Sequence, residues 1–368
     1  MEWLSHVASG VTSPGGLDSL TRSARMPDDD GGCRDRAEWS TRVSWPRMTR
    51  PEIARRRMYS QRLWGRRLES PKAVVGWLGA VQSQDFGVAK WSVAQRAWGA
   101  TDALVDQAFA DGSILRTHVL RPTWHFVLPQ DIRWMLAVTS PRVHARNALT
   151  NSRLALDGPL LSRTYAALAR ALEGGRHLTR SELGSVFASA GITASGVRLA
   201  HILMHAELEA IICSGPQRGK QHTYALLDER AAQTKPLDHD EALAELARRF
   251  FRARGPATVG DFARWSSLLM ADAKGGLAMI ESELGKEIDD GRTYWFGESA
   301  SGPKRLGPVI DLVQGFDESL VAYTDSKDVV LGPLAGEAVP SGRPLYLHGV
   351  LLDGQLAGHW RPVRARTR

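Results

Sequence analysis

The 368-residue chain contains only two cysteines, Cys33 and Cys213, which excludes a disulfide framework and a cysteine-rich metal site. No apolar run approaches the roughly 20 residues that a helix needs to cross a bilayer, and the first residues lack the apolar core of a signal peptide. Phosphate-loop, dinucleotide and G-x-S-x-G nucleophile motifs are absent. His201 and His205 have the i, i+4 spacing of metal ligands on a helix, which we attribute to chance because no third ligand is in sight. We expect no metal, no cofactor and no membrane, and a reducing, nucleoid-associated cytoplasmic location.

Positive charge is in modest excess. The chain has 47 Lys and Arg residues against 40 Asp and Glu residues, which gives a net charge of +7. Arginine predominates, and its planar guanidinium suits contacts to phosphates. This charge indicates either a polyanionic partner or a basic surface without a particular partner. The apolar content of 43% and charged content of 24% are typical of a globular protein.

The order of helical and strand-like patterns predicts a mainly α fold with short β-hairpins, an α+β class. From Pro51, helical patterns are followed by two short strands around Arg121-Pro122, which is the order of a winged helix. Two further segments repeat this order, and strands separated by Gly and Pro follow from Pro308. We predict a disordered extension at 1–47, winged helices at 48–158, 159–235 and 236–305, and a small C-terminal β-domain at 306–368.

More local expectations follow from the same patterns. In the second segment, Val197 begins an apolar helical stripe, and the stretch S-G-P-Q-R-G-K-Q-H is predicted as a wing loop between two strands. In the third segment, residues 287–296 read as one strand. In the last segment, strands are expected at 309–313, 329–331, 344–352 and 355–360.

Two glutamines stand two residues apart in the stretch A-V-Q-S-Q-D-F-G, between two apolar helical patterns. Residues i and i+2 of a helix lie on different faces, so Gln82 and Gln84 converge only if a helix ends there and the chain bends. Phe86-Gly87 favours such a break. Asp85 suits the N-cap of the following helix.

The stretch Q-S-Q-D, followed by K-W-S-V-A-Q-R and then by R-T-H-V-L-R-P-T-W-H-F-V-L-P, resembles the AlkZ-like DNA glycosylase family. The resemblance covers about residues 57–360. It implies a winged-helix protein marked by Gln, a small or aliphatic residue, then Gln; Ser83 is a mild departure from the aliphatic middle residue. G-F-D-E-S-L at 315–320 matches the start of the family's C-terminal β-domain. Relatives continue with more strands after Trp360, so we expect this domain to be truncated.

The chemistry implied by this resemblance is hydrolysis of a glycosidic bond. A purine alkylated on N7 is cationic and leaves as a neutral molecule, so it needs no general acid, and two amides can position the water. We predict a monofunctional DNA glycosylase that excises N7-alkylpurine-like, bulky or crosslinked bases from double-stranded DNA, with Gln82 and Gln84 orienting the water. Asp85 either stabilises the sugar cation, acts as a base or only caps a helix. The alternative for the glutamines is a pair of polar helix caps.

The residues expected to contact DNA lie downstream. Thr123 and His125 share a face if the segment is a strand, and both match the family pattern; His125 then contacts a phosphate or a water, or is bonded within the core. Four cations are candidates for phosphate contacts: Arg116, Arg121, Arg218 and Lys220. The alternative function is a non-catalytic winged-helix DNA-binding protein or transcription regulator. We expect a monomer in either case.

Overall fold

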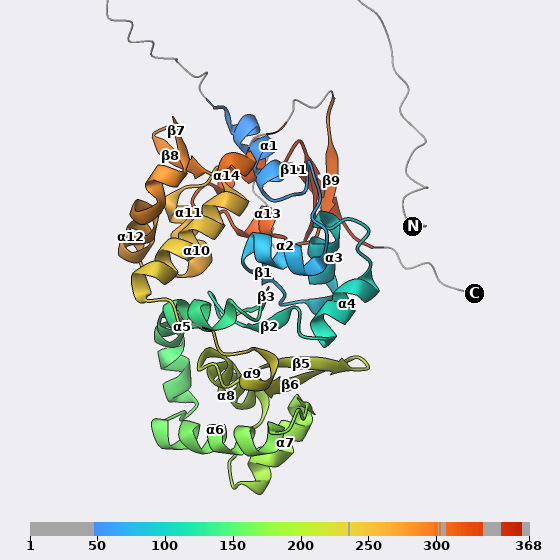
Figure 1. Ribbon diagram of the computed structural model, residues 1–368, viewed down its shortest axis with the longest axis vertical. Coiled ribbons are helices and arrows are strands. Elements are labelled where there is room, and N and C mark those ends of the chain that lie inside the picture. Colours follow the sequence, from blue (N-terminus) through green and yellow to red (C-terminus); the bar gives the residue numbers. More distant parts are fainter. Residues whose placement is uncertain (1–47, 235, 301, 303–306, 334–346, 363–368) are drawn as a thin grey trace, which may run out of the picture. The chain divides into compact units, whose positions relative to one another are not determined.

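The computed structural model describes residues 48–234, 236–300, 302, 307–333 and 347–362. Within them, helices alternate with small antiparallel sheets, so the mixed helical and sheet character predicted from the sequence is confirmed (Figure 1). The extension predicted at 1–47 lies outside the described residues. Among the described helices, none has both the length and the apolar character needed to cross a membrane.

The first segment begins with helices and ends with a small sheet. Its elements are α1 (Arg50–Ser60), α2 (Pro71–Leu78), β1 (Val81–Gln82), α3 (Phe86–Arg96), α4 (Asp102–Ala110), β2 (Leu115–His118) and β3 (Trp124–Val127). The helix starts follow local capping signals. Ser70, Asp85 and Thr101 each accept a backbone N–H of the first turn of the helix that follows.

The sheet of the first segment has the antiparallel order β1-β3-β2. Its register places Val81 opposite Phe126 and Gln82 opposite His125. Phe86, the first residue of α3, packs edge-on against Phe109 and Phe126, with ring centroids 5.0 and 5.5 Å apart. This aromatic cluster fixes the start of α3 against the sheet that carries the glutamine motif.

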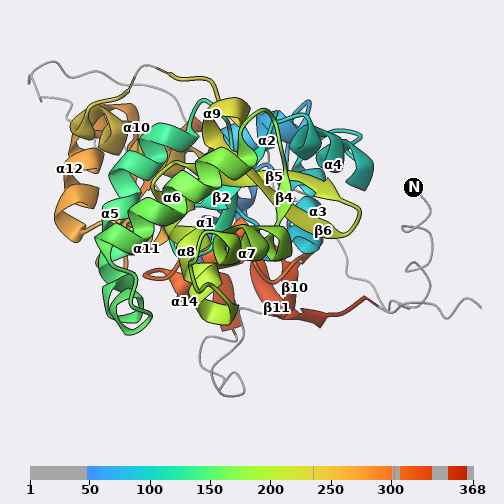
Figure 2. The same ribbon diagram turned by 90° about the horizontal axis from the view of Figure 1, so that it is seen from below.

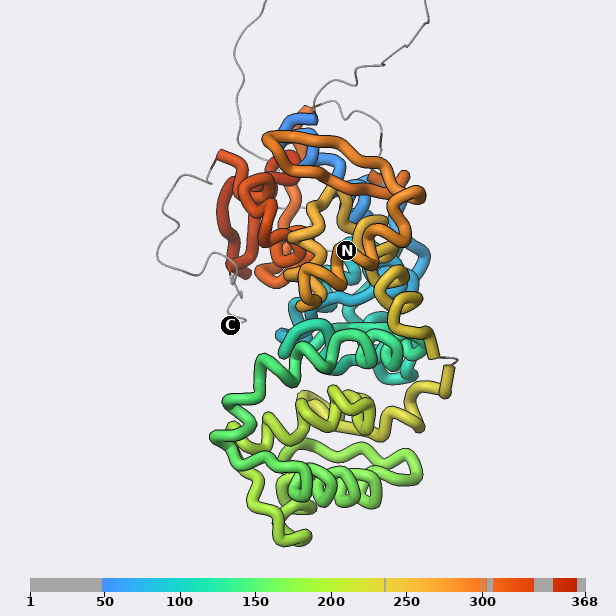
Figure 3. The backbone as a smooth tube through the Cα atoms, turned by 90° about the vertical axis from the view of Figure 1, so that its left-hand side faces the viewer, coloured from blue at the N-terminus to red at the C-terminus, as the bar shows by residue number. Residues whose placement is uncertain are grey.

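The second segment begins with a long helix, as the tube in Figure 3 shows. Its elements are α5 (Ile132–Arg153), α6 (Gly158–Leu172), β4 (Leu178–Thr179), α7 (Arg180–Ser189), α8 (Gly196–Leu208), β5 (Ile212–Arg218), β6 (Gln221–Leu226) and α9 (Leu227–Arg230). Thr179 and Glu182 form a capping box at the start of α7. Strand β5 contacts β2 and α4, so this hairpin reaches the first segment (Figure 2).

Two expectations for the second segment are wrong. Most of the predicted wing loop belongs to β5 and β6, which continue as a ladder with an irregularity between Gly215 and Arg218; the hairpin turns at Gly219, whose φ is +61°. Glycine permits this tight connection, so a long loop is not needed. Val197 is 64% exposed, because α8 instead buries the face that carries Leu199, Ile202 and Leu203.

The third segment is a helical layer with one hairpin. Its elements are α10 (His239–Arg254), α11 (Val259–Ser266), α12 (Met270–Ile280), the 3-10 turns η1 (Glu281–Glu283) and η2 (Glu298–Ala300), and strands β7 (Gly285–Asp289) and β8 (Arg292–Phe296). The single strand expected at 287–296 is therefore two strands. Asp290 and Gly291 both have positive φ and reverse the chain between them.

Where the structure describes the last segment, it comprises a three-stranded antiparallel sheet and two short helices. Its elements are β9 (Ile310–Val313), α13 (Glu318–Val321), α14 (Lys327–Leu331), β10 (His348–Leu352) and β11 (Gln355–Trp360). The strand predicted at 329–331 is wrong, because these residues end α14. A short apolar run is compatible with either structure, and here Val329 is buried in a cluster with Ile53 of α1. Residues 344–346 lie outside the described residues.

Candidate active site

The glutamine motif lies on extended chain rather than on a bent helix. Helix α2 ends at Leu78, and Gly79 follows with a φ of +74°. The chain then pairs as β1 with β3, and the Ser83 backbone N–H continues the pairing by donating to the Trp124 carbonyl at 2.8 Å. The expected helix end therefore comes before the two glutamines. Phe86-Gly87, where the break was expected, is the start of α3. Gln82 is the last residue of β1, and Gln84 lies in the bend that precedes α3.

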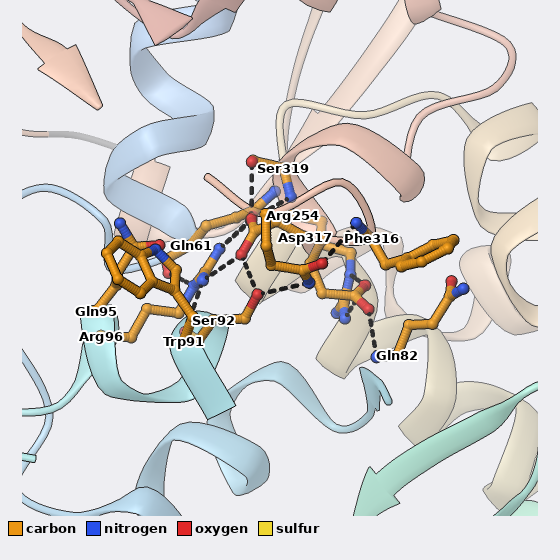
Figure 4. A network of polar contacts seen from close by, with 12 residues as sticks. Gln61, Gln82, Trp91, Ser92, Gln95, Arg96, Arg254, Phe316, Asp317 and Ser319 are labelled. Carbon is orange, nitrogen blue, oxygen red and sulfur yellow. Dashed lines mark hydrogen bonds and ion pairs between the residues drawn. The ribbon is translucent and has the colours of Figure 1, made fainter. Parts of the chain in front are cut away.

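Both the backbone and the side chain of Gln82 form hydrogen bonds within the protein. It is 7% exposed, and its backbone N–H donates to Glu318 Oε1 at 3.0 Å. Its side-chain Oε1 accepts from Arg121 Nη2 at 3.1 Å. The side chain therefore has a defined direction, which Figure 4 shows leading away from the ion pair of Arg96 and Asp317.

Gln84 and Asp85 are exposed and line a cleft. Gln84 Oε1 accepts from the Trp124 backbone N–H at 3.3 Å. Asp85 Oδ1 accepts from the backbone N–H groups of Gly87 and Val88, which confirms its expected place as the cap of α3. No described residue donates a hydrogen bond to its other oxygen, Oδ2.

The cleft has a volume of about 450 Å³ and lies between the glutamine motif and the β5–β6 hairpin. One wall carries Gln84, Asp85, Phe86 and Gly87, and the other carries Gln217, Gly219, Lys220 and His222. The Phe86 and His222 rings meet edge-on with centroids 5.2 Å apart. Residues predicted in two separate domains, Lys220 and Gln84, thus line the same concave site.

Arg121 and His125 form a network directly behind Gln82. The His125 side chain is fully buried, with Nδ1 2.9 Å from the Thr123 carbonyl and Nε2 3.0 Å from Arg121 Nη2. Burial, and then the charge of Arg121, lowers the pKa of His125 well below its ordinary value. A neutral imidazole with Nδ1–H donating to Thr123 and Nε2 accepting from Arg121 satisfies both contacts.

The other predicted DNA-contacting residues occupy different surroundings. Arg116 is buried, donates to the Ser83 carbonyl at 3.1 Å and lies 4.4 Å from the Trp124 ring centroid, and burial lowers its pKa to about 10. Arg218 is exposed and pairs with Glu182 at 2.7 Å. The structure therefore brings Lys220 to the cleft, whereas Arg116 and Arg121 bond to groups inside the protein. Thr123 Oγ1 is buried without a hydrogen-bond partner among the described residues.

Two buried ion pairs that the sequence reading missed support this site (Figure 4). Glu318 Oε2 accepts from Arg254 Nη2 at 2.7 Å and from Trp265 Nε1 at 3.0 Å, while Oε1 holds the Gln82 backbone. The Glu318 and Arg254 side chains are both 0% exposed. The sequence signal was the acidic pair in G-F-D-E-S-L, which we interpreted only as the start of a domain.

The second pair joins Asp317 to Arg96 of α3. Arg96 Nη1 and Nη2 donate to the two Asp317 oxygens, each at 2.8 Å, and Ser92 Oγ also donates to Asp317. Burial alone would raise the pKa of Asp317, but the charge and hydrogen bonds of Arg96 lower it to about 2. The C-terminal segment is therefore tied to the helix that follows the glutamine motif.

One cluster of possible metal ligands occurs in the described part of the chain. It comprises His144 of α5, with His205 and Glu209 at the end of α8, and their ligand atoms lie within 4.8 Å of one another. The His205 Nδ1 already bonds the Tyr165 hydroxyl at 2.5 Å, and the His144 and His205 rings overlap with centroids 4.3 Å apart. We assign this cluster no part in the chemistry at the glutamine motif.

Comparisons with known proteins identify the family and the fold that this chain resembles. A family model described as DNA glycosylase AlkZ-like matches residues 75–368. An interstrand DNA cross-link repair glycosylase from Streptomyces sahachiroi is 28% identical over 324 residues, covering 83% of this chain and 86% of that protein. The solved structure of Streptomyces sahachiroi DNA glycosylase AlkZ is similar in fold, with a TM-score of 0.72 and 26% identity, covering 86% of this chain and 89% of that one.

Proposed function

Because the chain belongs to the AlkZ-like DNA glycosylase family and is thus a DNA repair enzyme, we propose that it excises N7-alkylated purines, including bulky or crosslinked ones, from double-stranded DNA. The observation that carries the proposal is the cleft of about 450 Å³ lined by Gln84, Asp85 and Lys220. Gln82 precedes Gln84 by two residues and is buried. The S. sahachiroi relative is named for repair of interstrand crosslinks, which is the bulky case.

The groups at the cleft suit a leaving group that damage has already activated. Glutamine neither ionises nor serves as a strong base, so the pair itself supplies neither a general acid nor a general base. A purine alkylated on N7 carries a positive charge and departs neutral, so its departure needs no proton. The exposed Asp85 carboxylate supplies negative charge for the sugar cation and can accept the proton of the attacking water.

Binding of the duplex is proposed to use the three winged-helix units predicted at 48–158, 159–235 and 236–305. The β5–β6 hairpin, with Lys220 at its turn, acts as a wing that contacts a phosphate beside the extruded nucleotide. Arg218, on the same hairpin, also contacts a phosphate once its ion pair with Glu182 is broken. Arg116 and Arg121 have internal partners, so we assign them the support of the site rather than contact with phosphates.

The reaction is proposed to stop at the abasic site. Schiff-base chemistry needs a neutral amine, and the lysine nearest to the motif in sequence is Lys90. Although burial alone would lower the pKa of Lys90, its bonds to Asp102 and Asp106, at 2.7 and 2.9 Å, raise it above the ordinary value. Lys90 is therefore held as an ammonium group in a structural ion pair.

The test is single-turnover excision from duplexes that differ in one base. We expect release of N7-methylguanine, no release of uracil or unmodified guanine, and strand scission only after alkali. Uracil is the control for the chemistry because it leaves as an anion, and the glutamine pair supplies no proton to stabilise that anion. Excision of uracil at a comparable rate would contradict the requirement for a cationic base, and scission without alkali would contradict a monofunctional enzyme.

A further inference from the structure

Both glutamine oxygens are occupied by groups that can only donate. Gln82 Oε1 accepts from the Arg121 guanidinium at 3.1 Å, and Gln84 Oε1 accepts from the backbone N–H of Trp124 at 3.3 Å. The chemistry of these partners fixes which end of each amide is the oxygen. Neither NH₂ group has an acceptor among the described residues. Each NH₂ group is therefore available as a donor to a ligand, Gln84 at the cleft and Gln82 two residues before it in the chain.

The direction of the Gln82 amide is set more firmly than that of Gln84. Arg121 Nη1 donates to the Trp265 carbonyl at 2.7 Å, and its Nη2 lies 3.0 Å from His125 Nε2. His125 is in turn oriented by the Thr123 carbonyl at 2.9 Å. These contacts hold the guanidinium in one place, and a fixed guanidinium repels the NH₂ end of the amide and attracts its oxygen.

We propose that Gln82 acts as a hydrogen-bond donor to the nucleotide, and that Arg121 is the positioning residue that imposes this role. The inference rests on the proposed function. When the bond from C1′ to N9 breaks, its electron pair enters the purine and raises the electron density at N3 and O6. A donor aimed at either atom binds more tightly in the transition state than in the ground state. The water oxygen bonds to C1′, and its proton passes to Asp85 or to solvent.

The Gln82→Glu variant tests whether residue 82 acts as a hydrogen-bond donor or as a hydrogen-bond acceptor. The carboxylate is isosteric, keeps an oxygen for Arg121 and preserves the fold, but it has no NH₂ group. We expect its single-turnover rate on N7-methylguanine to fall about 100-fold, as far as that of Gln82→Ala. If Gln82 instead stabilises the sugar cation or activates the water, the negative carboxylate maintains or raises the rate. A rate within about threefold of the parent rate overturns the proposal.

A double-mutant cycle tests the role of Arg121. Arg121→Met alone is expected to slow excision about 100-fold, because the amide loses its orientation. In the Gln82→Ala background the same substitution is expected to add less than about a threefold loss. The control is Arg57→Met, which removes another buried arginine, one bonded to the Pro256 carbonyl and Ser326 Oγ. Its effect is expected to be the same in both backgrounds.

Equal losses from Arg121→Met in the two backgrounds would show a merely structural role and overturn the assignment. The outcomes also separate this inference from the proposed function. A parent protein that releases no N7-methylguanine refutes the function. An active parent with an active Gln82→Glu variant refutes the donor role alone.

Discussion

Replacing Glu318 with glutamine is expected to lower the free energy of unfolding by about 3–5 kcal/mol, because the substitution leaves Arg254 as an uncompensated charge inside the protein. Glu318 and Arg254 are both fully buried, with 2.7 Å between Glu318 Oε2 and Arg254 Nη2. The new NH₂ group would also face the Trp265 indole or the Gln82 backbone, which are both donors. Since many domains have a total stability of about 5–15 kcal/mol, the loss is a large fraction of it.

Chemical denaturation at neutral pH measures this effect. The matched control is Glu281→Gln, the same change in an exposed ion pair in which Glu281 lies 2.7 Å from Lys286. That control is expected to change stability by no more than about 1 kcal/mol. A Glu318→Gln loss as small as that of the control would contradict the proposed importance of this pair.

The Arg96–Asp317 pair is expected to show strong coupling and a defined pH dependence. Arg96→Met and Asp317→Asn each leave one buried charge without its partner, so each is expected to cost about 3–5 kcal/mol. The double variant contains neither charge, so its loss is expected to be about 2–3 kcal/mol smaller than the sum. Full additivity would contradict a direct pair.

Acid sensitivity follows from the lowered pKa of Asp317. The folded protein binds this proton less readily than the unfolded chain does, because the pKa is about 2 when folded against an ordinary value of 3.8. The stabilisation is thus present above about pH 4 and is lost as pH falls through about 2. Denaturation of the parent and the Asp317→Asn variant at pH 7 and pH 3 checks this, and the stability difference is expected to shrink at the lower pH.

Local signals in the sequence predicted local structure well. Asp85 caps the helix that it was expected to begin, since a capping hydrogen bond joins residues only a few positions apart. The structure also pairs β1, which carries Gln82, with β3, which carries His125 and is the middle strand of the sheet. The sequence could not predict how exposed the two glutamines are: Gln82 is buried, whereas Gln84 is exposed.

The buried ion pairs that hold the glutamine motif in place could not be predicted, since they join residues far apart in the sequence. Arg254 and Glu318 are 64 positions apart, and Glu318 is 236 positions from Gln82. Nothing local distinguishes a buried arginine at the end of α10 from a solvated one. The error at Val329 has a similar cause, because packing against α1 decided between helix and strand.

The most direct test compares two paired variants in single-turnover excision of N7-methylguanine from duplex DNA. Gln82→Ala/Gln84→Ala removes both amides of the site, whereas Gln107→Ala/Gln130→Ala removes two exposed glutamines elsewhere. We expect the first variant to lose about 1,000-fold in rate while it retains its fold and its affinity for DNA, and the second to match the parent. Equal rates in the parent and the Gln82→Ala/Gln84→Ala variant would show that the bond is cut without these amides and would contradict the assignment of the site.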